Sequence, residues 1–246
     1  MDGGTLGVYR FFGSFEGEYR GVANGMPNPQ QDDYKAMSAP NVQEKSTDSP
    51  LRWMMASEVA FLRAEGAMRG WTAEMGGTAE EFYNKGIELS FLENGLSADA
   101  AARYAADETS KPTDFTDVSA ANTKYNISAL GKITIKWNAG ASEEEQLERI
   151  ITQKWIAMFP NGTEAWSEFR RTGYPLIFPV RSNYPTSGVD TNKQIRRMVF
   201  PQSEYSNNGA AVQEAVKLLG GPNMSIFCDI VKNPDVLLDK ECLPYY

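Results

Sequence analysis

The chain of 246 residues contains no histidine, so the commonest general base and the commonest transition-metal ligand are both missing. Catalysis by a Ser-His-Asp or Cys-His arrangement is therefore excluded. Its two cysteines, Cys228 and Cys242, fit neither a disulfide scaffold nor a four-ligand zinc site. One bridge and two free thiols are both compatible with the sequence. The composition predicts no metal and no other cofactor.

Long hydrophobic runs are also missing, and negative charge exceeds positive charge. No window approaches the roughly 20 apolar residues that a membrane-spanning helix needs. The first residues, MDGGTLGVYRFFG, show neither the basic start nor the apolar segment of a signal peptide. The formal net charge of −8 gives a surface that repels phosphate backbones, so nucleic acid is not expected as a partner. Solubility is a sufficient reason for this acidity.

The stretch from Glu143 to Phe159 predicts a long helix with one broad buried face. Its side chains recur at helical spacing, with Lys154 contributing its aliphatic stem: Leu147, Ile150, Ile151, Lys154, Trp155, Met158 and Phe159. Ser142 precedes this run and Glu145 follows three residues later, which is the pattern of a capping box.

A second helix is expected directly after a break at residues 160–162. Asn161 is placed to cap it, and Gly173 and Pro175 are placed to end it. Its apolar side includes Trp166 and Phe169. Arg170 or Arg171 is expected to bridge to a carboxylate on a neighbouring helix, with Glu58 and Glu65 as the candidates.

Two further helices are predicted at Pro50–Gly70 and Thr78–Asn94, joined by a short turn at Gly76-Gly77. The first is expected to bury Met54, Met55, Val59, Leu62 and Ala67, and the second Phe82, Tyr83, Ile87, Leu89, Phe91 and Leu92. Thr78 with Glu81 forms a second capping box, and Ser97 caps a short helix to Glu108. Beyond Pro201, a turn and a last helix at about Asn208–Leu219 are expected.

Four of these pieces resemble, in the same order, the C-terminal half of the SusD/RagB family of Bacteroidetes nutrient-binding lipoproteins. They read EVAFLRAEGAMRGW, GGTAEEFYNKGIELSF, KWIAMF followed by EAWSEFRRTGYP, and IRRMVFPQSEYSNN. The resemblance covers roughly residues 50 to 220 and implies a mostly α fold. Tetratricopeptide-like helical hairpins with long irregular loops and little strand are expected. Strand-like pattern is limited to about Gly7–Phe12 and to Lys132–Trp137, which is expected to be an edge strand or an extended segment.

The expected organisation has three parts. Residues 1–49 are a loop-rich segment, 50–222 the helical SusD-like region, and 223–246 a tail that does not match the family's usual ending. The family is normally exported and lipidated on an N-terminal cysteine, and this chain shows neither feature. We therefore expect it to be the C-terminal portion of a longer protein.

The resemblance implies a binding protein and not an enzyme. The intact protein would sit on the outer face of the outer membrane, held there by a lipid anchor. It would bind a nutrient, with an oligosaccharide as the favoured ligand, and pass it to a SusC-like TonB-dependent transporter. The family's most characteristic residues are expected to be structural: Trp155, Trp166, Arg170, Arg171, Gly173, Tyr174, Arg197, Pro201 and Glu204.

Candidate ligand contacts come from aromatic and polar residues expected on loops, because the apolar face of a pyranose stacks on an aromatic ring. The aromatic candidates are Tyr9, Phe12, Tyr19, Trp71, Tyr125 and Trp137, with Asn24, Asn28 and Asp33 as partners for hydroxyl groups. The same rings would equally serve to pack the loops onto the helices.

One alternative is a tetratricopeptide-like scaffold that binds a protein partner and has no small ligand of its own. A glycosidase is disfavoured, because acidic pairs such as Glu80-Glu81 stand at helix starts, where they complement the helix dipole.

Overall fold

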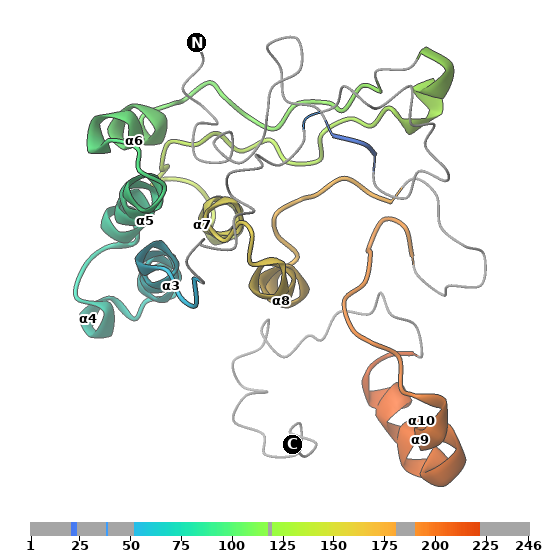
Figure 1. Ribbon diagram of the computed structural model, residues 1–246. Coiled ribbons are helices and arrows are strands. Elements are labelled where there is room, and N and C mark those ends of the chain that lie inside the picture. Colours follow the sequence, from blue (N-terminus) through green and yellow to red (C-terminus); the bar gives the residue numbers. More distant parts are fainter. Residues whose placement is uncertain (1–20, 24–37, 39–51, 118–119, 181–189, 222–246) are drawn as a thin grey trace.

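The computed structural model describes residues 21–23, 38, 52–117, 120–180 and 190–221, and Figure 1 shows packed helices from which long irregular segments extend. The helices are α3 (Ala56–Met68), α4 (Thr72–Met75), α5 (Ala79–Glu93), α6 (Ala98–Ala105), α7 (Glu143–Ala157), α8 (Gly162–Thr172), α9 (Gln202–Asn207) and α10 (Gly209–Leu218), with a 3-10 helix η3 (Ala120–Tyr125). Within these described ranges there is no strand, only an isolated bridge between Phe115 and Ile127. The predicted mostly helical fold is confirmed.

Helices α3 and α5 form an antiparallel hairpin, with α4 in the connection between them. At one end, the backbone N–H and hydroxyl of Ser57 donate to the Glu93 carboxylate at 2.9 and 2.6 Å. At the other end, the Arg63 guanidinium lies 3.9 Å from the ring centre of Phe82. A negative charge at the start of α3 complements the dipole of that helix.

The core lies among α3, α5, α6 and α7 and includes two side chains of the segment 132–137. Its larger buried side chains are Phe61, Tyr83, Ile87, Phe91, Tyr104, Ile135, Trp137, Leu147, Ile150 and Ile151. Tyr83 sits at its centre, and its hydroxyl donates to the carbonyl of Ile135. Burial raises the pKa of Tyr83 well above its ordinary value, so it remains a neutral donor.

The helix starts predicted from capping residues are confirmed for α5, α6, α7 and α8. Thr78 with Glu81, and Ser142 with Glu145, form complete capping boxes at α5 and α7. The side chains of Ser97 and Asn161 accept the backbone N–H groups of Ala100 and Glu164. Gly173 ends α8 in the left-handed conformation, with φ of 85°.

The prediction for α3 was wrong in two respects. The helix begins at Ala56 and not at Pro50, and the predicted apolar residues Met54, Val59 and Leu62 are exposed. The buried face instead carries Ser57, Glu58, Phe61 and Glu65 beside small residues. Polar groups can occupy this face because partner charges reach them from other helices, which an apolar pattern does not reveal.

Smaller corrections concern single side chains and short segments. Trp155 of α7 and Leu92 of α5 are exposed rather than buried, at 40% and 45%. The segment 132–137 takes the extended form that was the alternative to an edge strand, and its Lys136 N–H donates to the carbonyl of Asp107 at 2.9 Å. The turn expected at 201–208 contains the helix α9, and Figure 1 shows α9 and α10 standing apart from the other helices.

The strand expected at Gly7–Phe12 and the tail at 223–246 lie outside the described residues.

Candidate functional site

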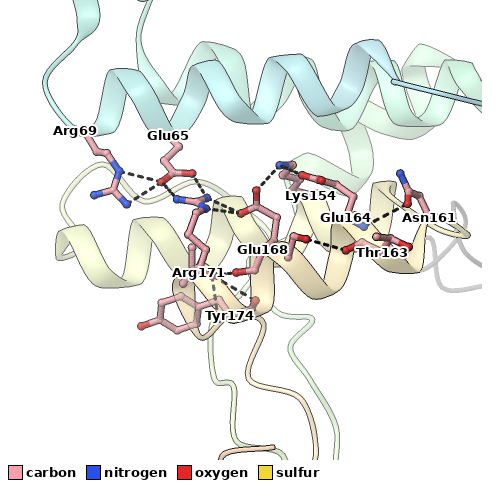
Figure 2. A network of polar contacts seen from close by, with 11 residues as sticks. Glu65, Arg69, Lys154, Asn161, Thr163, Glu164, Glu168, Arg171 and Tyr174 are labelled. Atoms are coloured by element: carbon pink, nitrogen blue, oxygen red, sulfur yellow. Dashed lines mark hydrogen bonds and ion pairs between the residues drawn. The ribbon is translucent and has the colours of Figure 1, made fainter. Parts of the chain in front are cut away.

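Charged side chains buried between α3, α7 and α8 form the most extensive polar network, shown in Figure 2. Arg171 of α8 donates to both carboxylate oxygens of Glu65 on α3, at 2.6 Å each. Glu65 also accepts from Arg69 at 2.8 and 2.9 Å, and Arg171 further contacts Glu168. The bridge expected from Arg170 or Arg171 is thus made by Arg171, to Glu65.

Lys154 is the most deeply buried member of this network. Its side chain is 1% exposed, and its ammonium lies 2.7 Å from Glu168 and 3.3 Å from Glu164. These two acids are one turn apart on α8, so the ammonium joins α7 to α8. A lysine can be buried as a cation only with such compensation.

The two acids of α3 respond to this network in opposite directions. Burial alone would raise the pKa of Glu65, but hydrogen bonds and charge from Arg171 and Arg69 hold it below its ordinary value. Burial raises the pKa of Glu58, and Lys154 only partly offsets this. Glu65 is therefore an ion-pair member, whereas the charged form of Glu58 is disfavoured by folding.

The remaining family-motif residues also make contacts within the protein. Arg170 lies over the ring of Trp166 at 4.6 Å, and the Trp166 indole N–H donates to the carbonyl of Ile195 at 3.0 Å. Arg197 donates to the carbonyl of Gly221 at 3.0 Å. Tyr174 donates to Glu144 at 3.0 Å, and Pro201 precedes α9 with Glu204 in its first turn. Trp155 is 40% exposed.

Three of the predicted ligand contacts can be placed. Trp71, at the turn between α3 and α4, is 57% exposed and offers an open ring. Tyr125 and Trp137 are buried, at 6% and 8% exposed, which corrects the expectation that they stand on open loops. The Trp137 ring packs 5.2 Å from Tyr83, because this irregular segment crosses the helical core.

The structure does not bring Trp71, Tyr125 and Trp137 together by any contact among the described residues. The other predicted contacts lie outside those residues: Tyr9, Phe12, Tyr19, Asn24, Asn28 and Asp33.

An open groove with a volume of about 650 Å³ lies between α5 and α6 and reaches the extended segment 132–137. Glu80, Asn84 and Glu88 of α5 form one wall, at a spacing of four residues. The small side chains of α6, such as Ala102, line the opposite side, and Trp137 contributes an aromatic edge. Figure 1 shows α5 and α6 side by side.

Two lysines at this groove are paired with acids. Lys136 bonds Glu108, and this contact raises the pKa of the lysine. Lys85 contacts Glu88 at 3.0 Å. Sequence reasoning missed Glu80, Asn84 and Asp99 as groove residues. Their spacing on exposed helix faces was a signal, but only the packing of α6 beside α5 makes a groove of them.

Within the described residues, no group of three or more His, Cys, Asp or Glu side chains could hold a metal ion. In the same part of the chain, no helix combines the length and apolar character needed to cross a membrane.

Comparison with known families identifies the fold. The model of SusD-like proteins, described as Susd and RagB outer membrane lipoprotein, matches residues 10–227. No curated protein sequence matches the chain. The chain belongs to the SusD/RagB family.

Solved structures agree with this assignment. A chitin-binding SusD homolog from Flavobacterium johnsoniae is 38% identical, with a TM-score of 0.73. The match covers 92% of this chain and 48% of the homolog. A SusD-like protein from Bacteroides thetaiotaomicron is 39% identical, with a TM-score of 0.74, and the match covers 91% of this chain and 48% of that protein. A SusD homolog from Bacteroides uniformis is 40% identical, with a TM-score of 0.73, and the match covers 91% of this chain and 48% of that homolog. The chain spans about half the length of these structures.

Proposed function

We propose that the protein is a non-catalytic binding protein for a nutrient, with an oligosaccharide as the ligand. The observation that carries this proposal is the 38% identity to a chitin-binding homolog over 92% of the chain. At that identity the helical framework that positions surface loops is shared, while individual loop residues are free to differ. The proposal therefore names a ligand class and leaves the particular glycan to experiment.

We further propose that the protein works at the outer face of the outer membrane, as its family description suggests, and delivers its ligand to a SusC-like TonB-dependent transporter. The buried charge network between α3, α7 and α8 supports a scaffold role for the family motif, because its charges are used in holding helices together. Such a site would bind by ring stacking and hydrogen bonds to hydroxyl groups, with no bond cleaved.

Isothermal titration calorimetry of the chain with N-acetylglucosamine, glucose, xylose and mannose hexamers tests the binding role. We expect saturable binding of at least one hexamer, unchanged in length after incubation. Absence of binding to every glycan, from a chain that melts cooperatively, would favour the alternative of a protein-interaction scaffold. Shortened oligosaccharides in the same sample would contradict the non-catalytic role.

A further inference from the structure

We propose that the groove between α5 and α6 is a binding site for a neutral oligosaccharide. This rests on the proposed function and extends it, since it assigns the ligand to a surface that includes, of the three expected contacts that the structure describes, only Trp137. The volume of about 650 Å³ lies within the ordinary range for small-molecule sites. The groove is formed by two packed helices, so its walls are held by the core beneath them.

The groove combines an apolar side with a polar side. The methyl groups of the α6 alanines form the apolar side, which suits the C–H face of a sugar ring. Opposite them stand the amide of Asn84 and the carboxylate of Glu80, and Asp99 stands at the start of α6. A sugar hydroxyl both donates and accepts, so an amide beside carboxylates can hold adjacent hydroxyl groups.

Several of these polar groups have no partner among the described residues. Trp137 is nine-tenths buried at the edge of the groove, and no described residue accepts a hydrogen bond from its indole N–H. Asn84 makes no side-chain hydrogen bond within the same part of the chain. Neither group is among the buried side-chain atoms without a hydrogen-bond partner, so both are open to the groove, where a ligand hydroxyl can take the place of water.

The charged side chains that line the groove determine which class of glycan it can bind. The groove presents the carboxylates of Glu80, Glu81, Glu88 and Asp99 against the ammonium groups of Lys85 and Lys136. Both lysines are already paired, to Glu88 and to Glu108. The local charge is thus negative, which repels uronic-acid and sulfated glycans and leaves neutral ones as the ligand class.

The test compares matched substitutions by calorimetry, with the neutral hexamer that binds the unaltered chain. Ala102→Trp fills the groove from an exposed position of α6 and should weaken binding at least twentyfold. Asn84→Ala should weaken it about five- to tenfold, as expected for one lost hydrogen bond. Arg103→Trp places the same bulk on the same helix outside the groove, and should leave binding within about twofold. Thermal melts check that all three variants fold.

Each outcome supports or overturns a defined statement. If no neutral glycan binds the unaltered chain, both the binding role and the groove are overturned. If one binds and Ala102→Trp leaves it unaffected, the groove alone is overturned. Tighter binding of galacturonate or hyaluronan hexamers, lost in Ala102→Trp, would overturn the neutral class. Oligolysine that binds here in place of any glycan would mark the groove as a peptide site.

Discussion

At the scale of single residues, the buried charges of α3, α7 and α8 are the most consequential side chains. Glu65 and Glu168 are 8% and 7% exposed, and Lys154 is 1% exposed. Removing one member of such a group leaves the others charged in a poorly solvated place. These residues therefore control stability more than neighbouring surface charges do.

Arg171→Ala should lower the free energy of unfolding by about 3 kcal/mol, because it leaves Glu65 without its two-oxygen partner. Urea denaturation followed by tryptophan fluorescence measures this. Arg69→Ala removes an arginine that binds only one oxygen of the same carboxylate, leaves Arg171 on both oxygens, and should cost less than about 1 kcal/mol. Equal losses in the two variants would contradict the special position of Arg171.

The two acids of α3 predict opposite pH effects. Glu65 has a lowered pKa in the folded protein, so its stabilising contribution is present above the ordinary value of 4.5 and is lost as pH falls through the folded pKa. Glu58 has a raised pKa, so its charged form destabilises the folded protein above 4.5.

At neutral pH, Glu65→Gln should therefore destabilise the folded protein, and Glu58→Gln should stabilise it. For both variants, the difference in the free energy of unfolding from the unaltered chain should become smaller toward acid pH. Denaturation curves from about pH 7 to about pH 3 measure them. Effects of the same sign in both variants would contradict the assigned directions.

At the scale of helices, close approach of α3 to α5 depends on a glycine. A β-carbon at Gly86 would lie 2.7 Å from the Phe61 ring, and that ring is buried in the core. This role of Gly86 is not apparent from the sequence, because a glycine inside a helix normally weakens it.

Gly86→Ala should lower stability by about 1–2 kcal/mol, because overpacking outweighs the better helix propensity of alanine. Gly162→Ala at the start of α8 is the matched control, since no atom lies within 4 Å of its added carbon. Thermal melts of both variants measure the difference. A gain in stability for Gly86→Ala would show that Phe61 can move aside.

The start of α7 is stabilised by a side-chain cap. Ser142→Ala removes the reciprocal hydrogen bonds with Glu145 at the start of α7 and should cost about 1 kcal/mol in urea denaturation. Ser167→Ala, within α8, removes only a hydroxyl that donates to the Thr163 carbonyl and should change stability little. A smaller loss for Ser142 than for Ser167 would contradict the importance of this cap.

At the scale of the whole molecule, the net charge of −8 limits the choice of partners. The chain should not bind double-stranded DNA or a heparin column at about 0.1 M salt, where a binding surface would need clustered positive charge. A gel-shift assay and column retention test this. Retention that falls with added salt would reveal a basic surface not apparent from the composition.

Prediction from the sequence succeeded where the determining contacts are local. Ser142, Thr78 and Asn161 fixed helix starts through partners three residues away, and the order of four motifs pointed to the family. It failed for α3, where Val59 and Leu62 face outward while Glu58 and Glu65 are buried. It also treated Trp137 as a ring available for stacking on a sugar, although that ring packs on Tyr83.

Residue types and neighbours within a turn thus specified the capped starts of α5, α6, α7 and α8, the family and the absence of histidine chemistry. Tertiary structure alone decided which helix faces are buried and where a groove opens. The contact between Arg171 and Glu65 joins residues 106 positions apart. The groove exists only because α6 packs beside α5 near Trp137. Burial and cavity shape depend on such distant partners, whose positions no local pattern specifies.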